Sequence, residues 1–124
     1  MLMSETPHHD EEKPALVSDA ELCELIGDDD LIYTATQIFD ALSDYTRFRI
    51  LGALSMGERS VKELEEVCNV SQSAVSHQLR LLRDRGLVSA RREGQRSVYT
   101  IADDHVNTLL RVGLEHAGHT FEGV

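Results

Sequence analysis

The chain has 124 residues, of which 41% are hydrophobic and 27% charged, a composition typical of one globular domain. No apolar run approaches the roughly 18–20 residues that a membrane span needs. The first residues lack the pattern of an export signal, and two cysteines do not make a disulfide framework, so we expect a cytoplasmic protein. The formal charge of −10 argues at first sight against nucleic acid, since phosphate binding depends mainly on Lys and Arg.

The charge is distributed unevenly. Residues 1–44 carry 12 acidic side chains and one lysine, whereas residues 71–100 carry six arginines and two acidic side chains. A basic segment of this kind is typical of a nucleic-acid site, even in an acidic protein. A solvated helix face explains it equally well, so charge alone leaves both interpretations open.

The N-terminal part of the chain predicts a tail and two helices. Residues 1–15 hold both prolines and an acidic run, which is typical of a mobile tail. Ser18 and Glu21 form a capping box that begins a short helix, and Gly27 can end it. A second helix begins within residues 28–30, after which apolar side chains recur at helical spacing.

Two further helices are expected next. Ser43 or Asp44 caps a helix that ends near Gly57. Ser60 and Glu63 then form another capping box, which begins a short amphipathic helix.

The following segment predicts a helix and then a hairpin. After a break at Asn69, Ser71 caps a helix that Gly86 terminates. Residues 87–92 and 96–101 have the pattern of two strands joined by a Glu-Gly-Gln turn. Two short helices with a tight break, followed by a hairpin, predict a winged helix-turn-helix.

A last amphipathic helix is expected from residue 103 to about residue 116. The predicted fold is mainly α with a β-hairpin wing, a winged helix-turn-helix that forms a homodimer. We expect a mobile acidic tail at 1–15, a DNA-binding and dimerisation domain at 16–120, and a C-terminal tail at 121–124.

The second helix of the helix-turn-helix offers a small polar face. Such a face can enter the major groove of DNA, which is about 12 Å wide, and read base edges. Each residue alone is an ordinary surface residue, but the joint pattern indicates double-stranded DNA as a partner. The expected contacts are Ser71, Gln72, Ser73, Ser76, His77 and Arg80 on the helix, and Arg91, Arg92, Gln95 and Arg96 on the wing.

The last helix and its start carry a group of candidate metal ligands: Asp103, His105, His116 and His119. The helical rise separates His105 and His116 by about 16 Å, whereas metal–nitrogen bonds are about 2 Å long. One helix therefore cannot bind one ion through all four residues. Two copies packed antiparallel across a two-fold axis can, with Asp103 and His105 of one facing His116 and His119 of the other.

The donor types predict the metal. Four nitrogen and oxygen ligands without sulfur suit Zn(II) in a closed tetrahedral site. If His8 and His9 add ligands from the tail, the coordination number rises and Ni(II) or Co(II) is favoured. Cys23 is a weaker candidate ligand, and Cys68, at an apolar position, is expected in the core.

These segments resemble the ArsR/SmtB family of metal-sensing winged-helix repressors. The resemblance covers about residues 31–119 and rests on ALSDYTRFRILGAL (41–54), VSQSAVSHQLRLLRDRGLV (70–88), RREGQRSVYTI (91–101) and the Asp/His group. It implies that the Asp/His group is the dimer-interface site of the family's zinc sensors. It also implies that the recognition helix carries Gln72, Ser73, Ser76 and His77.

The chain departs from the family pattern at a second metal site. Other members hold thiolates in an E-L-C-V-C or E-L-C-V-G-like motif, where this chain has Glu-Arg-Ser-Val-Lys with Ser60 in place of the cysteine. A sensor of soft metals or arsenite is therefore disfavoured.

The expected function is a transcriptional repressor that binds a palindromic operator as a metal-free homodimer and leaves it when Zn(II) binds. Release on metal binding follows from the resemblance alone. The alternatives are a Ni(II) or Co(II) sensor of the same fold, a family member that senses a non-metal signal such as redox state through Cys23, and a dimerisation module with a structural zinc. We do not expect an enzyme, because no nearby Glu base or nucleophile motif accompanies the Asp/His group.

Overall fold

The computed structural model describes residues 16–123, so the predicted tail with His8 and His9 lies outside the described residues. The helices are α2 (Asp19–Ile26), α3 (Asp29–Leu42), α4 (Tyr45–Leu54), α5 (Val61–Cys68), α6 (Gln72–Asp84) and α7 (Asp104–Gly123). The strands are β1 (Arg59–Ser60), β2 (Val88–Glu93) and β3 (Arg96–Ile101). This order confirms the mainly α fold with a β-hairpin wing.

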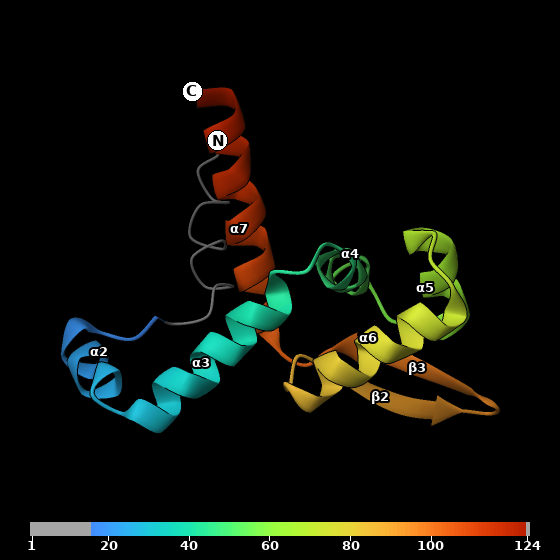
Figure 1. The fold of residues 1–124 in the computed structure, drawn as a ribbon, viewed down its shortest axis with the longest axis horizontal. Coiled ribbons are helices and arrows are strands. Elements are labelled where there is room, and N and C mark those ends of the chain that lie inside the picture. The colour runs from blue at the N-terminus through green and yellow to red at the C-terminus, as the bar shows by residue number, and fades with distance from the viewer. Residues whose placement is uncertain (1–15, 124) are drawn as a thin grey trace, which may run out of the picture.

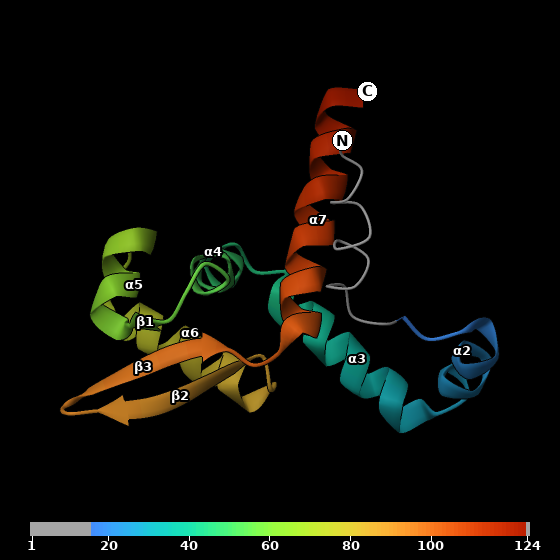
Figure 2. The same cartoon turned by 180° about the vertical axis from the view of Figure 1, so that it is seen from behind.

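The elements form one body with two arms. Figures 1 and 2 show α4, α5, α6 and the sheet close together, whereas α3 and α7 lead away from them in different directions. Helix α2 lies at the far end of α3. None of the helices in residues 16–123 is long and apolar enough to cross a membrane.

The helix starts follow the predicted capping residues. Ser18 with Glu21, and Ser60 with Glu63, form complete capping boxes. The starts of α3, α4 and α6 are capped by the side chains of Asp28, Asp44 and Ser71. Of the two candidates for the start of α4, Asp44 is the N-cap and Ser43 ends the preceding helix.

The break between α5 and α6 is a single left-handed residue. Asn69 has φ 57° and ψ 48°, a conformation that its short polar side chain tolerates better than most others do. Its backbone N–H donates to the carbonyl of Glu65, which closes the last turn of α5. The chain then reverses, and α6 begins after Ser71.

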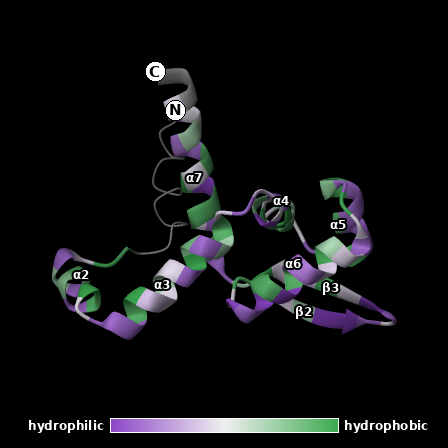
Figure 3. Cartoon of the chain, viewed as in Figure 1, coloured by the Kyte–Doolittle hydropathy of each residue, from purple (hydrophilic) through white to green (hydrophobic). Residues whose placement is uncertain are grey.

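The core lies between α4, α5, α6, the first half of α7 and one face of the sheet. Its largest fully buried side chains are Ile50, Leu51, Leu64, Val75, Leu79, Leu82 and Leu110. Figure 3 shows further hydrophobic positions along the two arms. Several of them are exposed in the single chain, among them Leu31, Ile32 and Phe39 on α3 and Val112 and Leu114 on α7.

The described residues form a sheet of three strands in the order β1-β3-β2, so the prediction of two strands was incomplete. β1 has only two residues, too few to show the alternation that identifies a strand in sequence. The hairpin turn is also shorter than expected, because Glu93 pairs with Arg96 as the last pair of the ladder. Gly94 takes a φ of 66° there, which glycine adopts without steric cost.

The last helix is longer than predicted. α7 continues past His116 to Gly123, and no proline follows His116 to interrupt it. Residues 121–123 are therefore part of this helix.

Candidate functional site

Helix α6 presents the predicted recognition face. Val75, Leu79 and Leu82 are buried and fix which side of the helix meets the core. The opposite side exposes most of the predicted DNA contacts, with Ser76 half-buried: Ser71, Gln72, Ser73, His77 and Arg80. Ser71 also caps the helix, because its hydroxyl accepts a hydrogen bond from the N–H of Ala74 at 3.2 Å.

The wing arginines differ in their surroundings, because side chains alternate between the two faces of a strand. Arg92 lies opposite Ser97, on the face that carries Tyr99, which packs against the core. Arg91 lies opposite Val98, on the other face. Val98 is only 3% exposed but is not part of the main core.

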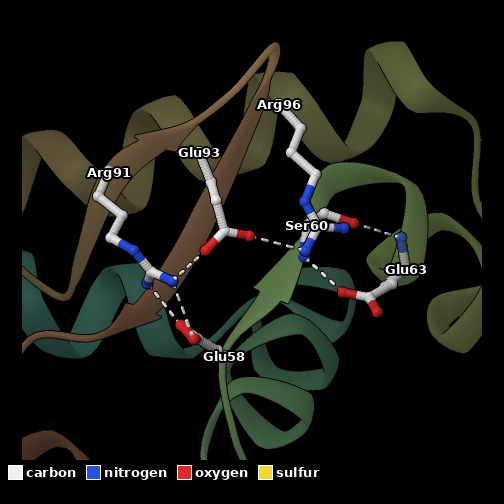
Figure 4. Close-up of polar contacts among 6 residues, drawn as sticks. All are labelled: Glu58, Ser60, Glu63, Arg91, Glu93 and Arg96. Carbon is white, nitrogen blue, oxygen red and sulfur yellow. Dashed lines mark hydrogen bonds and ion pairs between the residues drawn. The ribbon is translucent and has the colours of Figure 1, made fainter.

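Two of the predicted DNA-contacting arginines are held by carboxylates of the same chain (Figure 4). Arg91 binds both oxygens of Glu58, with N–O distances of 2.5 and 3.1 Å, and binds Glu93 at 2.8 Å. Arg96 pairs with the other oxygen of Glu93 at 3.0 Å. We call these four residues the wing clasp. Arg91 and Arg96 remain predicted DNA contacts, and the clasp shows where their guanidinium groups lie in the chain without DNA.

The clasp changes the acidity of its carboxyl groups. The hydrogen bonds from Arg91 lower the pKa of Glu58, and those from Arg96 and Arg91 lower the pKa of Glu93. Glu58 was not predictable as a partner of Arg91, since it lies 33 positions away and no local pattern connects the two residues.

A groove of about 700 Å³ lies between the wing, the N-terminal part of α5 and the start of α6. It brings Gln72 of α6 together with Arg92, Gln95 and Arg96 of the wing. Three glutamates of α5, including Glu63, also line it and reduce its positive character. One residue predicted to contact DNA from the helix and three predicted to contact it from the wing thus line the same groove.

Asp103 has a role in the fold that sequence analysis did not identify. Its Oδ1 accepts hydrogen bonds from the backbone N–H groups of His105 at 3.0 Å and Val106 at 3.3 Å. Asp103 is therefore the N-cap of α7. Its Oδ2 makes no hydrogen bond within the described part of the chain.

The four candidate ligands are exposed and spread along α7. The side chains of Asp103 and His105 are 58% and 74% exposed, and their nearest polar atoms are 3.6 Å apart. His116 and His119 are exposed more than two helical turns further on. Within residues 16–123, no three His, Cys, Asp or Glu side chains of one chain come close enough to hold a metal ion.

The two cysteines differ in exposure. Cys68 is buried, as predicted, and its burial raises the pKa of the thiol. Cys23 is exposed on α2. Neither forms a disulfide within the described residues.

Comparison with known proteins identifies the family. The protein-family model described as "Bacterial regulatory protein, arsR family" matches residues 44–90 of this chain. The chain is 45% identical over 80 residues to a transcriptional repressor SmtB homolog of Synechocystis sp., covering 64% of this chain and 61% of that protein. It is 43% identical over 84 residues to the HTH-type transcriptional regulator NmtR of Mycobacterium tuberculosis, covering 68% of this chain and 70% of that protein. The chain belongs to the arsR family.

The fold comparison agrees with the family. The structure is similar to the homodimeric winged helix-turn-helix DNA-binding domain of a possible ArsR-family transcriptional regulator from Mycobacterium bovis. The TM-score is 0.71 at 30% identity, and the match covers 90% of this chain and 96% of that one. The arsR-family assignment confirms the predicted winged helix-turn-helix and the expectation that the chain is a regulator rather than an enzyme.

Proposed function

We propose that this arsR-family chain is a homodimeric, metal-responsive transcriptional repressor. In this proposal the metal-free dimer binds a palindromic operator, and Zn(II) binding releases it. The observation that carries the proposal is the arrangement of α7: four exposed candidate ligands occupy one helix and its N-cap, too far apart to bind one ion within a single chain.

Exposed apolar side chains support a dimer built on the arms. Phe39 on α3 is 59% exposed, and Val112 and Leu114 on α7 are 56% and 58% exposed. Burying apolar area of this kind stabilises association by about 25 cal/mol per Å². Contact between the arms of two copies removes these side chains from water and brings the two α7 helices together.

The residues on α7 fit a zinc site shared between two copies. Histidine nitrogens and a carboxylate oxygen are the donors that Zn(II) takes in tetrahedral sites without sulfur. Asp103 can offer Oδ2 while Oδ1 keeps its cap on the helix. Asp103 and His105 of one copy, with His116 and His119 of the other, would make the four ligands.

The geometry of a two-fold dimer couples metal binding to DNA binding, and the family resemblance supplies the sign of that coupling, which is release. Two recognition helices must lie about 34–36 Å apart to read successive major grooves. Bound Zn(II) would tie α7 of one copy to α7 of the other and so restrict the angle between the copies. By linkage, DNA weakens metal binding by the same factor by which metal weakens DNA binding.

The proposal is tested by fluorescence anisotropy with labelled DNA from upstream of the chain's own gene, titrated with and without Zn(II). We expect Zn(II) to weaken binding, and His116→Gln to remove this response while leaving metal-free affinity unchanged. Glu115→Gln, a neighbouring change on the same exposed helix, is the control and should respond normally. Tighter binding with Zn(II) would reverse the model, and no binding to any DNA would favour a dimerisation module.

The choice of metal needs a separate experiment. Competition among Zn(II), Co(II) and Ni(II), with release of DNA as the signal, distinguishes a zinc sensor from a Ni(II) or Co(II) sensor of the same fold. Deleting residues 1–15 shows whether His8 and His9 contribute, since unchanged Ni(II) affinity excludes them. If none of the metals releases DNA, the regulator responds to a non-metal signal.

A further inference from the structure

The wing clasp neutralises most of the positive charge of the wing. Arg91 and Arg96 are paired with Glu58 and Glu93, two cations with two anions. Among the described residues, Arg92 has no ion-pair partner, and it lines the groove beside Gln72. The wing of the DNA-free chain therefore offers one uncompensated guanidinium, although its sequence contains three.

We propose that Glu58 occupies the guanidinium of Arg91 in place of a DNA phosphate and so limits binding to DNA of arbitrary sequence. The proposal rests on the DNA-binding function proposed above and adds a positioning residue to it. Glu58 approaches Arg91 through both carboxylate oxygens, the paired geometry that arginine also uses with phosphate.

Contact between Arg91 and a phosphate is an exchange of ion pairs. For Arg91 to contact a phosphate, it must first leave Glu58 and Glu93, so a new ion pair replaces existing ones. Counterion release is also reduced, because the charge of Arg91 is already balanced within the chain. Arg92 loses no partner when it meets a phosphate. Arg91 and Arg92, which are neighbours on β2, thus contribute unequally to phosphate binding.

The clasp also links the wing to the segment that leads into β1. Arg91 on β2 reaches past β3 to Glu58, which immediately precedes β1, on the face that carries Val98. Val98, which lies on this face, is 3% exposed. If Glu58 only stabilises the wing, it does not compete with phosphate for Arg91. The test must therefore distinguish a loss of wing stability from a loss of this competition.

The experiment compares the wild-type chain with Glu58→Gln on a labelled duplex of random sequence, with anisotropy measured over a range of salt concentrations. Without the Glu58 carboxylate, Arg91 and Arg96 share only Glu93, so one guanidinium charge becomes available to a phosphate. The slope of log Kobs against log salt should then steepen by up to about 0.9. Affinity for the random duplex should rise by about threefold between 200 mM and 50 mM salt beyond the wild-type change. Glu24→Gln on α2, far from the wing, carries the same charge change and should leave the slope unchanged.

A second pair of variants shows whether Glu58 acts through Arg91. In an Arg91→Gln background, adding Glu58→Gln should not alter the slope, because the guanidinium for which Glu58 and phosphate compete is gone. An unchanged slope for Glu58→Gln alone, while the wild-type chain binds DNA, would overturn the proposal. Weaker DNA binding by Glu58→Gln than by the wild type would also overturn it and would assign Glu58 to wing stability instead. Failure of the wild-type chain to bind either random or upstream DNA is a different result, which would overturn the DNA-binding function itself.

Discussion

Arg47 Nη1 donates a hydrogen bond to Gln78 Oε1 at 3.1 Å, and this contact joins α4 to α6. The same guanidinium donates to the carbonyl of Ala41 at 2.7 Å and to that of Asp40 at 3.3 Å. Both carbonyls belong to the last turn of α3, where helix carbonyls lack their usual partner. The carbonyl of Asp40 also accepts from the backbone N–H of Ser43 at 3.1 Å and from its hydroxyl at 2.7 Å. One side chain therefore fixes the arm α3 relative to the helix that would read DNA.

Replacing Arg47 with alanine should lower the free energy of unfolding by about 1–3 kcal/mol, since it leaves partly buried acceptors without their donor. Gln78→Ala removes only one of these contacts and should cost about 1 kcal/mol. Urea unfolding at fixed protein concentration measures both, because the stability of a dimer depends on concentration. Fully additive effects in the double variant would show that the two side chains are not coupled.

Asp103 should have separable roles in the helix cap and in metal binding. Asp103→Ala loses both and should lower stability by about 1 kcal/mol, the usual cost of a lost N-cap. Asp103→Asn keeps an oxygen for the cap, so it should retain stability while losing Zn(II) affinity. Thermal melting without metal and Co(II) absorption spectra measure the two effects. Wild-type affinity in Asp103→Asn would exclude this carboxylate as a ligand.

The wing clasp should weaken in acid. Because Arg91 lowers the pKa of Glu58 in the folded chain, the contribution of the pair is complete above the unfolded pKa of about 4.3 and is lost as the pH falls through the lower folded value. The stability difference between wild type and Glu58→Gln should therefore be constant from about pH 7 to pH 5 and shrink below about pH 4. Urea titrations at several pH values measure it. A difference that persists in strong acid would assign another role to Glu58.

The two thiols should react at very different rates. Cys23 is exposed, whereas burial raises the pKa of Cys68 and keeps its reactive thiolate scarce. At about pH 8, iodoacetamide should modify one thiol per chain quickly and the second only after unfolding in urea. Cys23→Ser should remove the fast reaction, as mass spectrometry of the labelled chain can verify. Rapid labelling of both thiols would mean that the core opens around Cys68.

Features that depend on neighbouring residues were predictable from the sequence. The two capping boxes, of which Ser60 with Glu63 is one, involve residues three positions apart and needed no tertiary information. Helical periodicity predicted the buried face of α6, and turn residues predicted the hairpin. The concentration of candidate ligands on one helix was equally visible, since their spacing is set by the helical rise.

The partners of the wing arginines were decided only by the tertiary structure. The position of Glu58 beside Arg91 depends on β1, a strand of two residues that no alternation pattern reveals. The same holds for Arg47, whose contact with Gln78 spans 31 positions. The sequence by itself determined the helices, the two strands of the hairpin, the basic segment and the set of possible ligands, because these follow from local spacing. Which charges remain free for DNA followed only from the folded chain, since ion pairing depends on distances between residues far apart in sequence.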